Sequence, residues 1–146
     1  MQRPTSIIAF EWAMWASFFV ALVSGLLDWD AILELYRTEP AIAAMGFGSG
    51  FIIAMWVFSF GLTLLFWFTI ARKGSKVAKW IYAVLMGLGV LMTLLTLTDP
   101  ATLGGVSMIG SLVSSALTTV SIFYLFRPDT AEWFAGRRPV DPDTFR

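Results

Sequence analysis

The stretch Ala41–Ala71, AIAAMGFGSGFIIAMWVFSFGLTLLFWFTIA, runs for 31 residues without a charged side chain. As a straight helix it would measure roughly 46 Å, whereas the hydrocarbon core of a bilayer is about 30 Å thick. Gly46, Gly48 and Gly50 crowd its beginning, and glycine disfavours helix. We therefore expect a membrane-spanning helix that is regular only from about Ser49 and that tilts, kinks or protrudes.

Three further apolar stretches have the length of a membrane span. Together with the first they predict spans at about 7–27, 43–71, 79–97 and 103–126. The composition agrees, because 58% hydrophobic residues, 14% charged residues and a mean hydropathy of +0.76 are too apolar for a soluble domain of 146 residues. The expected fold is all-α, a four-helix bundle integral to a membrane, forming one domain over 1–146 with a tail at 127–146.

The first apolar stretch has a second interpretation, a secretory signal peptide. Arg3 would be its basic start and Val23-Ser24-Gly25 its cleavage site. An acidic residue, Glu11, within the apolar region and a length that suits a span both favour a retained helix.

The basic residues are distributed unevenly about the predicted spans. Nine of the ten would lie on one side: Arg3, Arg72, Lys73, Lys76, Lys79, Arg127, Arg137, Arg138 and Arg146. The other side would hold one basic residue and five acidic ones: Arg37, Asp28, Asp30, Glu34, Glu39 and Asp99. Because basic residues near span ends stay in the cytoplasm, both termini should be cytoplasmic, in the inner membrane of a bacterium. The net charge of zero conceals this asymmetry.

Two short amphipathic segments are expected to form helices on the membrane surface. Asp28–Arg37, between the first two spans, begins with a capping Asp and carries apolar residues at helical spacing. Pro128–Phe134, after the last span, has Asp129 at the cap and Glu132 three residues later. Trp12, Trp67, Trp80, Trp133 and Trp29 suit the two interfaces, whereas Trp56 falls deeper and is expected to pack against a neighbouring helix or to face lipid.

The chain contains no Cys and no His, which excludes several kinds of catalytic and metal site. Disulfides, thiolate nucleophiles, Cys/His zinc sites, histidine-ligated haem and imidazole-dependent catalytic triads are excluded. Gly74 stands alone in the basic link between spans two and three, so there is no phosphate-binding loop, and no soluble basic fold is present. We therefore expect a protein without enzymatic activity that binds no cofactor, metal, nucleotide or nucleic acid.

Glu11 is the one ionisable residue inside a predicted span, and such residues are costly to place in a membrane. It lies about 6 Å along the helix from Ile7, close enough to the interface to reach water or to pair with Lys76 or Lys79. Structural pairing is the favoured interpretation, and a proton or cation site is the alternative.

Small residues recur at a spacing of four on three of the spans, and such patterns allow close approach of helices in lipid. They are expected to mark helix contacts, either within the chain or between subunits: Gly46, Gly50 and Ala54; Ala83 and Gly87; Ser107, Ser111 and Ser115. The fourth span is also rich in hydroxyls, and Ser111, Ser115 and Thr118 could either line a path or form hydrogen bonds to nearby carbonyls. Arg72, Lys73, Lys76 and Lys79 in the basic link should attract anionic lipid headgroups.

Several short motifs give the chain a recognisable outline. Arg3-Pro4, Phe10-Glu11, Trp29-Asp30, the basic link and the closing Phe126-Arg127-Pro128 resemble those of small four-span bacterial inner-membrane proteins with no assigned activity. A glutamate in the first of four spans is similar in outline to small multidrug-resistance transporters, although there the acid lies deeper and the loops are shorter. The first resemblance implies a location and a shape, not a reaction.

Two functions follow as hypotheses. The first is a scaffold, accessory subunit or assembly factor of a membrane complex, which would act through helix and loop contacts with other subunits or with itself. The alternative is a small oligomeric transporter or channel that uses Glu11 and the Ser/Thr face of the fourth span.

Overall fold

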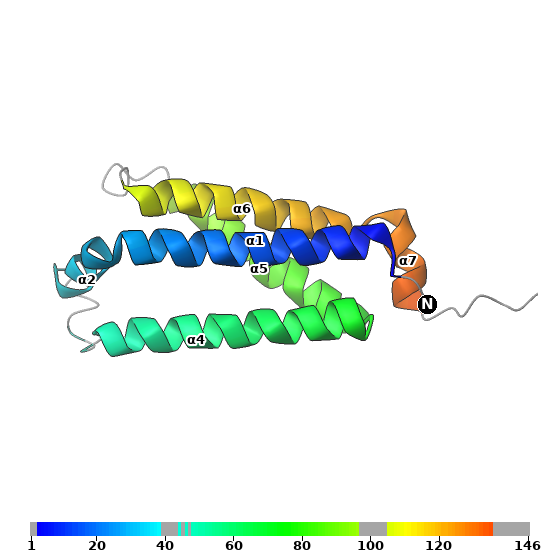
Figure 1. Cartoon of the computed structure of the whole chain (residues 1–146), viewed down its shortest axis with the longest axis horizontal. Coiled ribbons are helices and arrows are strands. Elements are labelled where there is room, and N and C mark those ends of the chain that lie inside the picture. The colour runs from blue at the N-terminus through cyan, green and yellow to red at the C-terminus, as the bar shows by residue number, and fades with distance from the viewer. Residues whose placement is uncertain (1–2, 39–43, 45, 47, 97–104, 136–146) are drawn as a thin grey trace, which may run out of the picture.

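The structure of the chain is a computed structural model that describes residues 3–38, 44, 46, 48–96 and 105–135. This part is helical throughout its regular structure (Figure 1). The elements are α1 (Thr5–Leu27), α2 (Trp29–Thr38), α4 (Ser49–Phe66), the π-helical η1 (Trp67–Arg72), α5 (Lys76–Thr96), α6 (Val106–Leu125) and α7 (Pro128–Ala135).

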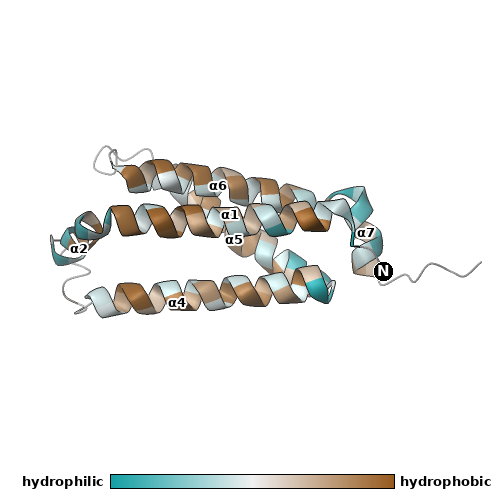
Figure 2. Cartoon of the chain, viewed as in Figure 1, coloured by the Kyte–Doolittle hydropathy of each residue, from teal (hydrophilic) through white to brown (hydrophobic). Residues whose placement is uncertain are grey.

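Four of these helices are long and apolar enough to cross a membrane: α1, α4 continued by η1, α5 and α6. The second of them begins at Ser49, as the glycines near the start of this apolar stretch predicted. Short helices, α2 and α7, follow the first and last of these four helices where the sequence placed them. Figure 2 shows an apolar middle with hydrophilic residues gathered at the two ends. The tail beyond residue 135 and the acidic residues Glu39 and Asp99 lie outside the described residues.

Helices α1 and α6 run antiparallel, side by side, and make the most extensive helix contact of the described chain (Figure 1). Small residues on both helices allow this close approach. Gly110 of α6 lies directly against Ser24 of α1, so that a Cβ atom at Gly110 would come within 2.3 Å of the Ser24 Cβ atom. The α1–α6 interface is therefore the structural centre of the molecule.

The aromatic core lies toward one end of the bundle, which contains Arg3, η1 and α7 and is called the basic end below. The ring of Tyr82 on α5 packs edge-on against Phe10 of α1 and Phe66 of α4, with 5.3 Å between centroids in each pair. Three helices thus meet at a single buried side chain, and Ile7, Ile70 and Leu125 fill the space around them. Edge-to-face ring pairs add about 0.5–1.5 kcal/mol each to the burial of the rings.

Helices α4 and α5 are peripheral. Only Ile52 and Phe66 of α4 and Tyr82 of α5 are buried. The opposite end contains α2 with Asp30 and Glu34 and is called the acidic end below. There Trp56 of α4 packs against the rest of the chain, because its ring lies 5.4 Å from that of Trp29 and covers Gly25 of α1. Trp56 therefore packs against a neighbouring helix, one of the two positions expected for it.

Candidate functional site

The middle of the α1–α6 interface is a cluster of hydroxyls. Ser17 Oγ donates to the carbonyl of Ser114 at 3.0 Å, and Ser114 Oγ donates to the carbonyl of Ser17 at 3.0 Å. Ser17 Oγ also lies 2.7 Å from Oγ1 of Thr118. These reciprocal bonds fix the register of the two helices, since a slip of either helix would break them together. Hydrogen bonds between membrane helices contribute on average about 0.6 kcal/mol each.

The interface is closed at the acidic end by a carboxylate. Asp28, the residue after α1, accepts a hydrogen bond from the backbone N–H of Ser107 in the first turn of α6. Gly105, at the N-cap position of α6, has φ +88°, and a Cβ atom there would lie 2.9 Å from Oδ2 of Asp28. Glycine at this position thus lets another helix supply the capping side chain.

The basic end repeats this arrangement in reverse. Asp129, just after α6, accepts from the Ser6 hydroxyl at 2.9 Å and from the Ser6 backbone N–H at 3.3 Å, in the first turn of α1. Each helix of the pair is therefore capped by an aspartate that follows its partner. Backbone and side-chain hydrogen bonds from Ser107 lower the pKa of Asp28, and those from Ser6, the side-chain bond foremost, lower the pKa of Asp129.

Glu11, the candidate proton or cation residue, is held by two donors at the basic end. Its Oε1 atom accepts from Nη1 of Arg3 at 2.7 Å and from Nε1 of Trp67 at 3.0 Å. The ion pair with Arg3 is the one found among the described residues, so the expected pairing with Lys76 or Lys79 is wrong in its partner. Arg3 lies two residues before α1, and its long side chain extends forward along the helix to Glu11. The Glu11 carboxylate is therefore held in place by two neighbouring side chains.

The hydroxyls predicted as candidates on α6 do not come together. Thr118 is buried at the α1–α6 interface, whereas Ser111 is exposed and donates to the carbonyl of Ser107 one turn earlier. Ser115 is half-buried, and its carbonyl accepts from Thr119. A hydroxyl that donates to a carbonyl of its own helix, as that of Ser111 does, already has its hydrogen-bond acceptor.

The predicted small-residue patterns also lie largely outside the contacts within the chain. Gly46 precedes α4, Gly50 and Ala54 lie on its exposed surface, and a Cβ atom at Gly46, Gly50 or Gly87 would meet nothing within 4 Å. Ala83 and Ser107 are half-buried, and Ser107 contributes its N–H to Asp28. The close contact on α6 is made three residues further along, by Gly110, Ser114 and Thr118.

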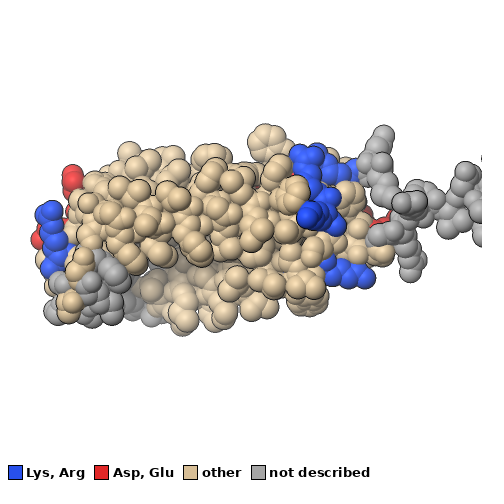
Figure 3. Space-filling model, turned by 90° about the horizontal axis from the view of Figure 1, so that it is seen from below, with Lys and Arg blue, Asp and Glu red and all other residues tan. Residues whose placement is uncertain are grey.

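The four basic residues predicted to contact anionic lipid gather at the basic end (Figure 3). Arg72, Lys73 and Lys76 are exposed. Lys79 is half-buried, with Nζ 4.1 Å from the ring centroid of Phe126 and 4.9 Å from that of Phe134. These cation–π contacts stabilise the junction of α5 with α7 and the end of α6. Arg72 and Lys73 also lie over aromatic rings, at 4.8 Å from the ring centroid of Trp67 and 5.0 Å from that of Phe68.

Sequence reasoning missed Ser17 and Ser24 on α1 and Gly110 on α6. The spacing of seven between Ser17 and Ser24 is a signal that could have found the first two, because it places them on one helix face. On α6, small or hydroxyl residues occupy two adjacent faces, so periodicity alone does not say which face meets α1.

Comparison of the chain with protein-family models, with curated proteins and with solved structures finds no match. Its function therefore has to be inferred from the geometry above.

Proposed function

We propose that the chain is a non-enzymatic, four-span protein of the bacterial inner membrane that acts through helix contacts, as a scaffold, accessory subunit or assembly factor. The observation that carries this proposal is the unequal burial of its apolar helices. A third of the most apolar window of α1 is buried (33%), but only 17% of that of α6, 11% of that of α4 with η1 and 6% of that of α5. Helix α1 is thus the centre of the fold, and α4 and α5 are the helices that present the most surface outward.

The charge distribution supports a membrane location and an orientation. Figure 3 shows an uncharged middle with most of the visible Lys and Arg side chains at one end and most of the visible acidic side chains at the other. The basic end would face the cytoplasm, with both termini on that side, and α2 and α7 would lie at the two membrane surfaces. Arg72, Lys73 and Lys76 would then contact anionic headgroups.

The outward surfaces of α4 and α5 suit other membrane helices or another copy of this chain. Gly50, Gly61, Gly87 and Gly89 all have open space where a Cβ atom would stand, and small residues let helix backbones approach closely in lipid. The transporter alternative draws less support from the contacts. Glu11 is paired with Arg3 and Trp67, Ser111 is bonded to a carbonyl of its own helix, and Thr118 is bonded to Ser17 of α1.

Site-specific photo-crosslinking in native membranes tests this function. A benzophenone side chain in place of Val57 on α4, which is 66% exposed, should form discrete protein adducts, whereas the same group in place of the buried Met14 should not. Lipid adducts alone from Val57 and from an equivalent position on α5, Met92, would contradict the proposal. Proton flux in proteoliposomes that Glu11→Gln abolishes would instead favour the transporter.

A further inference from the structure

Helix α4 ends in the π-helical turn η1 (Trp67–Arg72). In an α-helix with 3.6 residues per turn, two side chains five residues apart point about 140° away from each other. A π-helix forms hydrogen bonds between residues five apart, so that such side chains come to one side of the helix. The N–H of Lys73 donates to the carbonyl of Phe68 at 3.1 Å, which is a bond of this kind. π-Helical turns are rare, and they frequently lie at functional sites.

Two basic side chains of this segment lie over aromatic rings five residues before them. The Cζ atom of Arg72 is 4.8 Å from the ring centroid of Trp67, and Nζ of Lys73 is 5.0 Å from that of Phe68. The indole of Trp67 is itself fixed, because its Nε1–H donates to Oε1 of Glu11 at 3.0 Å. The exposed phenyl ring of Phe68 has no polar atom that could be held in this way. Arg72 therefore has the more rigid support.

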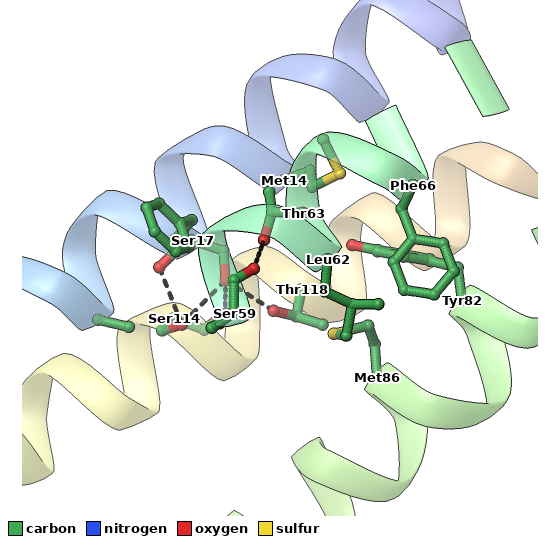
Figure 4. A pocket seen from close by; sticks show the side chains of 12 residues that line it. Met14, Ser17, Ser59, Leu62, Thr63, Phe66, Tyr82, Met86, Ser114 and Thr118 are labelled. Atoms are coloured by element: carbon green, nitrogen blue, oxygen red, sulfur yellow. Dashed lines mark hydrogen bonds between the residues drawn. The ribbon is translucent and has the colours of Figure 1, made fainter. Parts of the chain in front are cut away.

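The opposite face of the same segment is anchored in the core. Figure 4 shows Phe66, the residue before η1, directed at the ring of Tyr82 on α5, and the two ring centroids are 5.3 Å apart. Ile70, in the middle of η1, is fully buried. These contacts fix the rotation of the turn about its axis, so that the half-buried Trp67 and the exposed Arg72 keep their places at the surface.

The Arg72 guanidinium forms no ion pair with an acidic side chain among the described residues. The carboxylate that holds the indole of Trp67, that of Glu11, is paired with Arg3, and this is the one ion pair of the described chain. A guanidinium that stacks on a ring does so by its flat face, whereas its five N–H donors point outward in the plane of the group. Arg72 can therefore lie over Trp67 and donate two parallel hydrogen bonds to an oxyanion at the same time.

The position of Arg72 along the helix indicates which oxyanion would meet it. Arg72 is the last residue of the apolar segment Ser49–Arg72, so it stands where a span leaves the hydrocarbon and enters the headgroup layer. The phosphate diesters of phospholipids lie at that level. Two exposed lysines close by in the sequence, Lys73 and Lys76, would repel the ammonium of a zwitterionic headgroup and favour a headgroup with net negative charge.

We propose that Arg72, supported by Trp67, binds the phosphate of a single anionic phospholipid in a discrete site, with Trp67 and Glu11 as positioning residues. Such a site differs from the diffuse attraction of headgroups to the basic link. Diffuse attraction depends on charge alone, whereas this site depends on the planar guanidinium and on the ring beneath it. The inference rests on the membrane location proposed above, but not on a protein partner.

Native mass spectrometry of the full-length protein, released from detergent micelles, tests the site with two lipids of equal chain length. Dioleoyl-phosphatidylglycerol should bind as a single molecule per chain, with a dissociation constant at least about tenfold below that of dioleoyl-phosphatidylcholine. Millimolar inorganic phosphate should leave that lipid bound, and its displacement would overturn the assignment to a lipid. Equal affinities for the two lipids would overturn the site alone, whereas recovery of the chain in the soluble fraction of cells would contradict the membrane location itself.

Charge-conserving variants distinguish the site from diffuse attraction. Arg72→Lys keeps the charge but loses the planar fork, so the affinity for phosphatidylglycerol should fall at least about fivefold. Arg127→Lys is the matched control, because Arg127 also lies over a ring, 5.9 Å from the centroid of Tyr124, but has the acidic Asp129 beside it. Its affinity should equal that of the wild type. Trp67→Leu removes the supporting ring and should weaken binding as Arg72→Lys does. Unchanged affinity in Arg72→Lys would refute the site.

Discussion

Replacement of Gly110 by alanine should destabilise the protein more than any other addition of a single methyl group to a described glycine. The added Cβ atom would stand 1.8 Å from Ser24 Oγ and 2.3 Å from Ser24 Cβ, whereas ordinary contact needs 3.4–4 Å. Rotation of the Ser24 side chain can move Oγ but not Cβ, which the backbone holds. The axes of α1 and α6 must therefore separate by about 1 Å.

Such a separation also stretches the bonds among Ser17, Ser114 and Thr118, which now measure 2.7–3.0 Å. Overpacking costs about 1–3 kcal/mol, and three weakened bonds at about 0.6 kcal/mol each bring the expected loss to about 3–5 kcal/mol. The assay is reversible unfolding by SDS in mixed micelles, followed by far-UV circular dichroism.

Two variants complete this experiment. Gly61→Ala adds the same methyl group where nothing lies within 4 Å, so it should be neutral or stabilising by up to about 1 kcal/mol. In the Ser24→Gly background, which removes the opposing Cβ atom, Gly110→Ala should cost little. Equal stability of the Gly110→Ala and Gly61→Ala proteins would refute the close packing of α1 on α6.

Three further predictions concern the charged residues. The pKa values of Asp28 and Asp129 are lowered in the folded protein, so their stabilising effect is complete above the ordinary value of 3.8 and is lost as the pH falls through the folded values. The Asp28→Asn/Asp129→Asn protein should therefore show a weaker pH dependence than the wild type when thermal unfolding is followed from about pH 6 to pH 3. Glu11→Gln keeps an acceptor for the indole N–H of Trp67 but loses the ion pair with Arg3, and it should reduce the free energy of unfolding by about 1 kcal/mol or less. A loss several times larger would contradict a partly exposed ion pair. Cysteines that replace Thr38 and Lys73, both exposed in a chain without native Cys, should react with impermeant maleimide from opposite sides of the membrane, and labelling from one side only would contradict the orientation.

The helices themselves follow from local sequence, and for this reason they were predictable. Uncharged stretches of span length leave few alternatives to helix in a membrane, and the glycines before Ser49 set the start of α4. Pro128 and Asp129 made the start of α7 predictable in the same way, since both residue types favour the first turn of a helix. These local features can be read without knowing which helices pack against each segment.

The contacts between helices depend on rotation about each axis, which composition leaves undetermined. Ser111 and Ser114 are both small and polar, yet one is exposed and the other bonds across to α1. The partner of Glu11 also depended on geometry, because Arg3 lies 8 residues away along the chain but beside it in space. The reciprocal capping by Asp28 and Asp129 joins residues 79 and 123 positions from their partners, which no local pattern reveals.

Disulfide formation between engineered cysteines tests the α1–α6 interface most directly. The side-chain oxygens of Ser17 and Thr118 lie 2.7 Å apart, so the Ser17→Cys/Thr118→Cys protein should form an intramolecular disulfide rapidly under mild oxidation in native membranes. The control pair Ser17→Cys/Thr119→Cys lies at nearly the same depth, but Thr119 is exposed, and it should remain reduced under the same conditions. Cross-linking of the control pair as fast as the Thr118 pair would contradict the register on which the core of this protein depends.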